Sequence, residues 1–360
     1  MKHWQEAAAI FERIAARGDP PVRQALATVV RISGSAYRRP GARLLIPERG
    51  PTFGGVSGGC LEADVREIAQ QVMRSGIARL RHYDTGSDED TVWGLGLGCE
   101  GAVDILVQPV DGAFLEVLVP RARQLMAAGV PLALATAVGG PRTGRTALWG
   151  RGSLAAPSGD AEMDAALQRD APGLVEGGAS QVMERGPHTL FVEVLTPPPH
   201  LVVFGAGDDA LPLVRLALEV GFQVTIVDHR PAHLTPERFP PPARLLLRRS
   251  EEGVEGLDLG PRHQAVVQTH SLAHDRGWIR ALLRSPIAYL GLLGPKARRA
   301  ELLEELGIQP THRLYAPVGL DVGADGPEQV AVSIVAEMLA VQSGRRPGHL
   351  RDREGAIHAG

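Results

Sequence analysis

Two spacings of hydrophobic residues occur in the first half of the chain, and together they predict helices and strands in mixed order. Apolar residues recur every three or four positions at 5–17, 61–73 and 115–126, which predicts a helix in each segment. Runs of apolar and β-branched residues predict strands at 25–32, 42–46, 79–83, 103–107 and 132–138. The turn 34–41 joins the first two strands, so we expect a hairpin-like pair. The first half is therefore predicted to be an N-terminal α/β domain.

In the second half, short apolar strands alternate with amphipathic segments. The pattern predicts a helix at 211–220 and strands at 201–204, 224–228, 245–247, 265–269 and 289–293. Such an alternation is typical of a parallel sheet with helices on both faces. Three prolines at 197–199 precede the first of these strands, and proline does not fit inside a helix or a central strand. We therefore predict one domain at 1–196, a second at 200–343 and a polar tail at 344–360.

One short sequence occurs twice in the first half. Ala-Leu-Ala-Thr stands at 25–28 and again at 133–136, and each copy leads into a glycine-containing turn and another strand-like run. Four small residues recur easily by chance. Internal duplication of the first half is therefore a hypothesis that the fold has to test.

Length, charge and composition exclude several classes of function. A chain of 360 residues exceeds the size at which one core keeps growing, which agrees with two domains. The formal net charge is -3 and aromatic residues make up 4%, so neither nucleic acid nor an anionic membrane is an expected partner. No stretch approaches the roughly 18 uninterrupted apolar residues of a membrane helix, and the first residues do not resemble a signal peptide. We expect a cytoplasmic protein that handles small molecules or proteins.

The start of the second domain carries a dinucleotide-binding signature. The sequence Gly-Ala-Gly-Asp-Asp-Ala that begins at Gly205 fits G-x-G-x-x-A, and Asp228 ends the next predicted strand about 20 residues further on. This context predicts a Rossmann-type, doubly wound parallel sheet in which Gly205 and Gly207 approach a phosphate and Asp228 meets ribose hydroxyls. Asp208 and Asp209 oppose phosphate binding unless a cation, a side-chain rotation or a different ligand relieves their charge. The alternative is a glycine turn that serves packing only.

Polar residues also follow two later strands of this domain. His270 and Lys296 each come shortly after a predicted strand, and the carboxyl ends of strands in an open α/β sheet border one crevice. We therefore expect both side chains to lie near the glycine turn, as candidates for ligand binding. For His274 and Asp275, solvated positions in the first turn of a helix are the simpler interpretation.

The chain has two cysteines, and each lies in a glycine-rich run. Cys60 ends the run 54–60 and Cys99 lies in the run 94–101. Glycine lets backbone amides approach a ligand, and thiolates bind soft metals or carry sulfur as a persulfide. Two cysteines make neither a disulfide framework nor a standard zinc site, and the alternative is a pair of small, inert residues packed between glycines. Three nearby arginines either contact phosphate or are simply solvated, namely Arg38, Arg39 and Arg43.

Six motifs spread over residues 25–342 resemble those of one known family. They begin at Gly34, Gly55, Gly96, Gly205, Gly291 and Ala316, with the sequences GSAYRRPG, GVSGGCLE, GLGCEG, GAGDDA, GLLGP and APVGLDVGA. In these motifs the chain resembles the XdhC/CoxI accessory proteins of molybdenum hydroxylases such as xanthine dehydrogenase and carbon monoxide dehydrogenase. It departs from the family pattern at Asp208 and Asp209, where many members carry a histidine.

The resemblance implies a chaperone that binds the molybdenum cofactor, supports its sulfuration by a cysteine desulfurase and delivers it to the hydroxylase apo-enzyme. A homodimer follows from the same likeness. The cofactor would be molybdopterin or its cytosine dinucleotide form, with its molybdenum end at the cysteine runs and its phosphate end at the glycine turn. The candidate catalytic and metal-binding residues are Cys60 and Cys99, and the candidate cofactor-binding residues are Gly58, Gly59, Gly98, Gly205, Gly207, Asp228, His270 and Lys296. We further predict that the two cysteine loops converge in space and face the Rossmann crevice.

Two other functions stay open on the sequence alone. An NAD(P)-dependent oxidoreductase would use Asp228 for the ribose and His270 or Lys296 as acid or base. That function leaves both cysteine runs unexplained. A non-enzymatic, protein-binding scaffold with a vestigial Rossmann site is the third interpretation.

Overall fold

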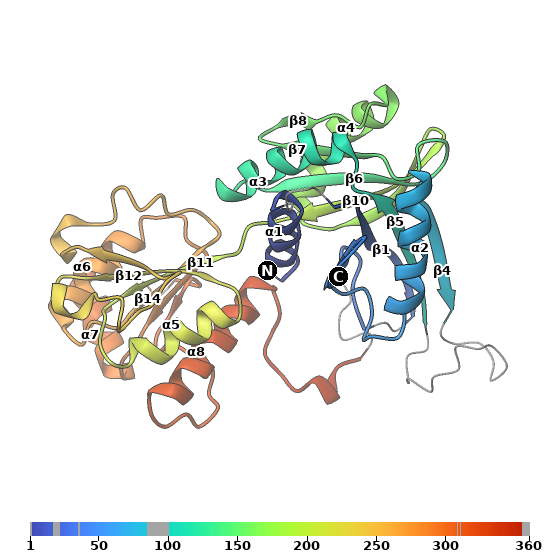
Figure 1. Cartoon of the computed structure of the whole chain (residues 1–360). Coiled ribbons are helices and arrows are strands. Elements are labelled where there is room, and N and C mark those ends of the chain that lie inside the picture. The colour runs from blue at the N-terminus through green and yellow to red at the C-terminus, as the bar shows by residue number, and fades with distance from the viewer. Residues whose placement is uncertain are drawn as a thin grey trace. The chain divides into compact units, whose positions relative to one another are not determined.

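The computed structural model describes residues 2–16, 22–34, 37–84, 101–307, 309 and 311–354. The chain divides into two compact units, here named the N-terminal unit (Lys2–Pro197) and the C-terminal unit (Pro198–Gly360) (Figure 1). Each unit encloses hydrophobic clusters of its own. Gly98 and Cys99, which the sequence analysis singles out, lie outside the described residues.

The N-terminal unit contains the same series of elements twice. The first series is α1 (Lys2–Ala15), β1 (Gln24–Gly34), β2 (Arg43–Pro47), β3 (Phe53–Gly54), α2 (Glu62–Ser75), β4 (Arg79–Asp84) and β5 (Gly101–Pro109). The second is the π-helical turn η1 (Phe114–Leu118), α3 (Val119–Ala127), β6 (Leu132–Gly139), β7 (Thr146–Gly150), β8 (Ser153–Ala156), α4 (Ala161–Gly177), β9 (Gln181–Arg185) and β10 (His188–Leu195). Within the described residues, the strands form two antiparallel sheets, ordered β3-β2-β1-β5-β4 and β8-β7-β6-β10-β9. The repeated strand order confirms internal duplication at the level of the fold.

The two sheets of the N-terminal unit face each other, and helices cover their outer faces (Figure 1). Successive side chains of a strand point to opposite faces. Leu26 and Thr28 of β1 accordingly face the second sheet, whereas Ala25 and Ala27 pack with the buried side of α2. Helix α4 covers the second sheet in the same way, and α1 contacts α3. The predicted pair of β1 and β2 is confirmed, whereas β9 and β10 lie where the sequence analysis predicts no strand.

The C-terminal unit is a doubly wound sheet of parallel strands. Its strands are β11 (His200–Phe204), β12 (Gln223–Asp228), β13 (Arg244–Leu247), β14 (His263–Val267), β15 (Tyr289–Leu292) and β16 (Leu314–Tyr315). Its helices are α5 (Ala210–Glu219), α6 (Leu272–Leu282), α7 (Lys296–Leu306) and α8 (Pro327–Gln342), with the 3₁₀ turns η2 (Pro231–His233), η3 (Ser250–Glu252) and η4 (Leu350–Asp352). Helices α5 and α8 pack on one face, and α6 and α7 on the other (Figure 1). The fold class predicted from the sequence is confirmed.

The strand order of this sheet, β13-β12-β11-β14-β15-β16, places a switch point between β11 and β14. Ligands of open α/β sheets bind beyond the carboxyl ends of the strands at such a point. Gly205 follows β11 and Gln268 follows β14, so the glycine turn lies at the switch point. The topology therefore positions this turn where a Rossmann-type site is expected.

Candidate functional site

The loop that carries Cys60 is held in shape by one serine and one carboxylate. The backbone amides of Val56 and Ser57 donate to Oε1 of Glu62 at 3.3 and 3.0 Å, and the Ser57 hydroxyl donates to the other carboxylate oxygen. The amides of Gly59 and Leu61 then donate to Ser57 Oγ at 3.0 and 3.1 Å. Burial opposes ionisation of Glu62, but these hydrogen bonds outweigh it and lower the pKa of Glu62 below its usual value. The loop is therefore fixed at the N-terminus of α2.

The glycines before the cysteine leave space above this loop. Gly59 has φ +115°, and a Cβ added there would meet no atom within 4 Å. A Cβ on Gly58 would meet the ring of Tyr37 at 3.7 Å. Cys60 is half-buried, has a free thiol and packs against the hydrophobic cluster beneath α2. The thiol thus sits at the border between that cluster and the open surface of the loop.

A cavity of about 410 Å³, here named the Arg38 pocket, lies beside the Cys60 loop. Its lining comes from α1, from the β1–β2 turn and from the loop itself, and includes Glu6, Tyr37, Arg38, Gly55 and Ser57. Arg38 donates to Glu6 Oε2 at 2.8 Å, while its Nε atom is buried and has no partner among the described residues. A buried donor without a partner costs free energy unless a ligand or water satisfies it. This cavity is the part of the N-terminal unit best suited to a polar ligand.

The arginines near the loop have different environments. Arg39 is exposed, as a solvated arginine would be. The expectation that Arg43 is solvated is wrong, because its side chain is buried and paired with the equally buried Glu193 of β10. That pairing connects the two sheets, and contact of Arg43 with phosphate stays a prediction.

Gly101 is the first described residue after Cys99. Gly101, two residues after Cys99, begins β5 and pairs with Gly34 at the end of β1. Three residues after Gly34, Tyr37 lies against Gly58. Residue 101 and the Cys60 loop therefore border the same end of the first sheet. The convergence of the two thiols, and their relation to the Rossmann crevice, stay predictions.

The glycine turn of the C-terminal unit is built as its sequence predicts. Gly205 has φ +113°, and a Cβ there would lie 2.5 Å from the carbonyl oxygen of Gln268. Only glycine allows the ends of β11 and β14 to approach this closely. The amide of Ala206 donates to Asp228 Oδ2 at 2.7 Å, which ties the turn to the end of β12. The turn thus brings three strand ends together.

Asp228, the predicted ribose ligand, already has its hydrogen-bonding capacity filled. Arg230 donates to it from its amide at 2.9 Å and from Nε and Nη2 at 3.0 and 2.8 Å, in addition to the Ala206 amide. Burial opposes ionisation, but these donors outweigh it and hold the pKa of Asp228 well below its usual range. A carboxylate with about four acceptor sites that receives four donors has little left for a ribose diol.

Asp208 and Asp209 both contact side chains of the chain itself. Arg238 donates to Asp208 Oδ1 at 2.8 Å, and this hydrogen bond lowers the pKa of Asp208. Arg238 also donates to the carbonyl of Ala206 at 3.2 Å. His270, which has φ +57°, lies 2.9 Å from Asp209 through Nε2. Arg238 is missed by the sequence analysis, because the segment between β12 and β13 carries no pattern that predicts its return to the turn.

The other predicted residues of this edge differ in their surroundings. Lys296 is exposed at the start of α7. The solvated position expected for Asp275 is wrong, because Asp275 is fully buried and accepts hydrogen bonds from Thr269 and Arg298. His274 is half-buried, with Nδ1 3.1 Å from the Ser250 hydroxyl. Gly205, Gly207, Asp228 and His270 are therefore brought together, and the place of Lys296 beside them stays a prediction.

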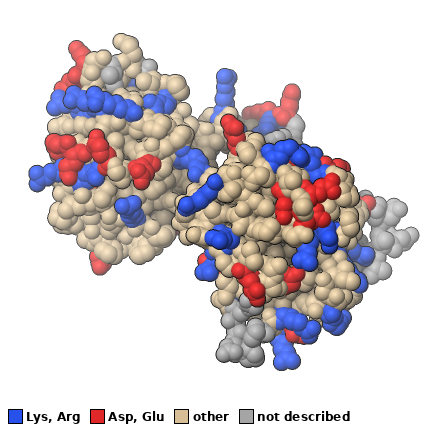
Figure 2. All heavy atoms as spheres, turned by 90° about the horizontal axis from the view of Figure 1, so that it is seen from above, with Lys and Arg blue, Asp and Glu red and all other residues tan. Residues whose placement is uncertain are grey.

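Surface charge, possible metal ligands and helix length of the described residues bear on which ligands and partners the chain can have. On the face shown in Figure 2, basic and acidic side chains are interspersed and form no large patch of one sign. Within the part of the chain that the structure describes, no group of three or more His, Cys, Asp or Glu side chains could hold a metal ion. The described helices include none that is both long and apolar enough to span a bilayer.

Comparisons with known proteins match both units. A family model described as the XdhC Rossmann domain matches residues 201–338, and one described as the XdhC and CoxI family matches residues 20–84. A Bacillus subtilis (strain 168) protein, described as a probable xanthine dehydrogenase subunit, is 32% identical over 320 residues, which covers 87% of this chain and 92% of that protein. The uncharacterized protein YqeB of Escherichia coli (strain K12) is 36% identical over 199 residues, which covers 51% of this chain and 36% of that protein.

A solved structure has the same fold over nearly the whole chain. It is described as a xanthine dehydrogenase from Bacillus halodurans, with 29% sequence identity and a TM-score of 0.79. The match covers 94% of this chain and 96% of that one. Both units are therefore matched in one known protein.

Proposed function

The chain belongs to the XdhC and CoxI family, and on that basis we propose that it is an accessory protein of a molybdenum hydroxylase of the xanthine dehydrogenase or carbon monoxide dehydrogenase type. Its cargo in this proposal is the molybdenum cofactor. The chain binds the cofactor, presents it to a cysteine desulfurase for sulfuration and passes it to the apo-enzyme. No turnover of a separate substrate is required.

The residues around the Cys60 loop fit such a cargo. A molybdopterin offers a soft molybdenum–sulfur end, which suits a thiolate, and a polar pterin that hydrogen-bonding groups can hold. The half-buried thiol of Cys60 belongs to the loop that lines the Arg38 pocket through Gly55 and Ser57, and the partnerless Nε of Arg38 belongs to a residue of the same lining. Gly59 leaves the loop surface open for a large ligand. The partnerless Arg38 donor is the observation that carries this assignment.

Cys99 is proposed to act beside Cys60. The segment that carries it reaches Gly101 at the end of the sheet that the Cys60 loop borders. A consecutive Cα spacing of about 3.8 Å limits how far two residues can depart from that point. Both thiols would then bind molybdenum or hold the sulfur to be transferred.

Cofactor content of the purified protein tests the proposal. The full chain is co-expressed with the cofactor biosynthesis pathway and purified without oxygen, and molybdenum and pterin are measured per chain. We expect both in near-equal amounts, with at least a tenfold loss in Arg38→Ala and in Cys60→Ser. Arg39→Ala is the matched control, because Arg39 is exposed and does not line the pocket. Wild-type protein without molybdenum or pterin would refute the proposal.

The alternative, an NAD(P)-dependent oxidoreductase, meets an obstacle at Asp228. In that function the carboxylate accepts the ribose hydroxyls, but here Arg230 and the Ala206 amide occupy it. Calorimetric titration with NADH and NADPH distinguishes the two functions. Micromolar binding that is weakened by Gly207→Val would support the oxidoreductase.

A further inference from the structure

The register of the paired strands shows which positions of the two halves of the N-terminal unit correspond. The strand ladders pair Thr28 with Arg43 and Thr136 with Thr146, and they pair Leu26 with Gln108 and Leu134 with Glu193. The repeated sequence Ala-Leu-Ala-Thr places 25–28 on 133–136. Arg43 therefore corresponds to Thr146, and Gln108 corresponds to Glu193.

These corresponding residues contact one another across the two sheets in a reciprocal way. Arg43 of the first half pairs with Glu193 of the second, with Nη1 and Oε1 3.0 Å apart. Thr146 of the second half accepts a weaker hydrogen bond from Gln108 of the first, with Oγ1 and Nε2 3.4 Å apart. Each contact is the counterpart of the other, as a two-fold relation between identical modules requires. The halves are therefore arranged as a pseudo-symmetric pair.

The loop that corresponds to the Cys60 loop is shorter and has no cysteine, but it contains a similar serine–carboxylate hydrogen-bond pattern. In the first half, Ser57 bonds to Glu62, and the amide two residues after the serine donates to its Oγ at 3.0 Å. In the second half, Ser158 donates to Asp164 Oδ1 from its amide and hydroxyl at 2.8 and 2.7 Å. The amide two residues later again donates to the serine Oγ, at 3.1 Å. The β8–α4 loop is thus the twin of the β3–α2 loop.

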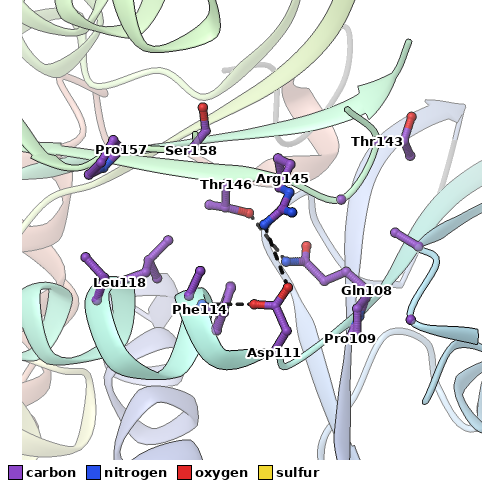
Figure 3. A pocket seen from close by; sticks show the side chains of 15 residues that line it. Gln108, Pro109, Asp111, Phe114, Leu118, Thr143, Arg145, Thr146, Pro157 and Ser158 are labelled. Atoms are coloured by element: carbon purple, nitrogen blue, oxygen red, sulfur yellow. Dashed lines mark hydrogen bonds and ion pairs between the residues drawn. The ribbon is translucent and has the colours of Figure 1, made fainter. Parts of the chain in front are cut away.

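A cavity of about 100 Å³, here named the Arg145 pocket, lies beside this twin loop (Figure 3). Its polar lining includes Gln108, Asp111, Arg145 and Ser158. Asp111 lies just before the π-helical turn η1, and Arg145 stands directly before β7. The two pockets each contain an acid, an arginine and a serine, but Arg145 is not the counterpart of Arg38, because the correspondence of Arg43 with Thr146 places Arg145 on Ala42.

In the Arg145 pocket the charged pair is loose. Arg145 and Asp111 approach to only 3.9 Å, and their side chains are 50% and 48% exposed. Among the described residues the Arg145 guanidinium makes no hydrogen bond, whereas Asp111 uses one oxygen to cap the amide of Phe114 at 3.0 Å. Figure 3 shows Arg145, Gln108 and Asp111 pointing toward one another. The Arg145 guanidinium and the second carboxylate oxygen of Asp111 are therefore available to a ligand, whereas Gln108 is buried and donates to Thr146.

We propose that the Arg145 pocket binds the edge of a flat nitrogen heterocycle that carries a ring N–H beside a carbonyl, as in a pterin or a guanine. Asp111 accepts from the N–H and Arg145 donates to the carbonyl. Apolar side chains of Phe114 and Leu118 also line the cavity and suit the faces of a ring. A simple anion would meet Asp111 and a simple cation would meet Arg145, so a donor–acceptor edge fits best. This proposal does not depend on the proposed function.

Titration of the full-length chain with free pterin, followed by fluorescence anisotropy, tests the site, and guanine is titrated in parallel by calorimetry. We expect saturable binding of pterin, guanine or both, weakened at least tenfold by Arg145→Ala and by Asp111→Asn. Asparagine preserves the helix cap of Asp111, so loss in this variant reports the carboxylate. Arg142→Ala is the matched control, because Arg142 belongs to the same turn and does not line the pocket. The ratio of the two affinities distinguishes the ligand sources.

Three results would overturn the proposal. The first is absence of binding by either heterocycle at millimolar concentration. The second is binding that responds to Arg38→Ala and not to Arg145→Ala, which would assign the heterocycle to the Arg38 pocket alone. The third is competition by inorganic phosphate that strengthens in Asp111→Asn, which would mark an oxyanion site. None of these results bears on molybdenum retention, so the two proposals fail independently.

Discussion

Removing one partner of the buried ion pair between Arg43 and Glu193 should destabilise the protein strongly, whereas replacing both partners by neutral groups should destabilise it little. The two side chains are only 7% and 3% exposed, so neither charge can be solvated if its partner is removed. Arg43 also donates to the carbonyl of Gly41 at 3.0 Å. Removing one partner of such a pair costs about 3–5 kcal/mol, whereas replacing both by neutral groups of similar volume is often neutral. We therefore expect Arg43→Met to lower the free energy of unfolding by about 3–5 kcal/mol.

The double variant Arg43→Met/Glu193→Gln tests the reasoning most directly. Gln108 and Thr146 occupy the corresponding positions as a neutral pair, so the same core already accommodates uncharged groups there. We expect the double variant to recover at least half of the loss. The assay is urea denaturation with hydrogen exchange of peptides from β1 and β10, which separates the N-terminal unit from the C-terminal unit.

An exposed ion pair provides the control. Arg23 and Glu48 lie 2.6 Å apart, but their side chains are 59% and 40% exposed, and solvent-exposed ion pairs contribute little to stability. Arg23→Met should therefore leave the denaturation midpoint almost unchanged. A cost of less than about 1 kcal/mol for Arg43→Met, or a double variant as unstable as the sum of both single variants, would refute the argument.

Three further predictions concern the C-terminal unit. Gly205→Ala should destabilise it by about 2–4 kcal/mol in urea denaturation, because the new Cβ would lie 2.5 Å from the Gln268 carbonyl oxygen at φ +113°. Asp228→Asn should lower the free energy of unfolding by about 1.5–3 kcal/mol at pH 7, because the donors of Arg230 lose a charged acceptor. The difference in stability between wild type and variant should shrink below pH 4, where Asp228 of the unfolded wild-type chain becomes protonated. Burial lowers the pKa of His200 to about 4, so between pH 6.5 and 4 the unfolded chain binds a proton that the folded chain does not. The free energy of unfolding should therefore decrease as the pH is lowered through this range, by up to about 1.4 kcal/mol per pH unit. His200→Gln should flatten that slope.

The sequence predicts those elements whose signals are local. The apolar strands of the C-terminal unit and the turn at Gly205 follow from patterns within a few residues of each other, and the structure contains them. The same reasoning could have predicted strand β10, because its run of β-branched and apolar residues around Glu193 is typical of a strand. The duplicated fold is only hinted at by four residues, since the remaining correspondence lies in strand order and not in residue identity.

The candidate site was less predictable, because its contacts join distant segments. Asp275 could not be recognised as buried from its neighbours, since Arg298 comes from another helix. Asp228 matches the ribose-binding signature, yet Arg230 occupies its carboxylate. Conversely, the partnerless Nε of Arg38 depends on how Glu6 is placed by α1, which no local pattern encodes.

The reciprocal contacts across the two sheets have a consequence for how this chain can vary. In a dimer of identical modules, one substitution changes both symmetry-related contacts at once, so both must tolerate it. Fusion of the modules into one chain removes that constraint. One contact has a charged pair, Arg43 with Glu193, while the other has the neutral Gln108 and Thr146. The same freedom lets one loop keep a cysteine while its twin keeps only the serine, so that one module can specialise while the other preserves the architecture.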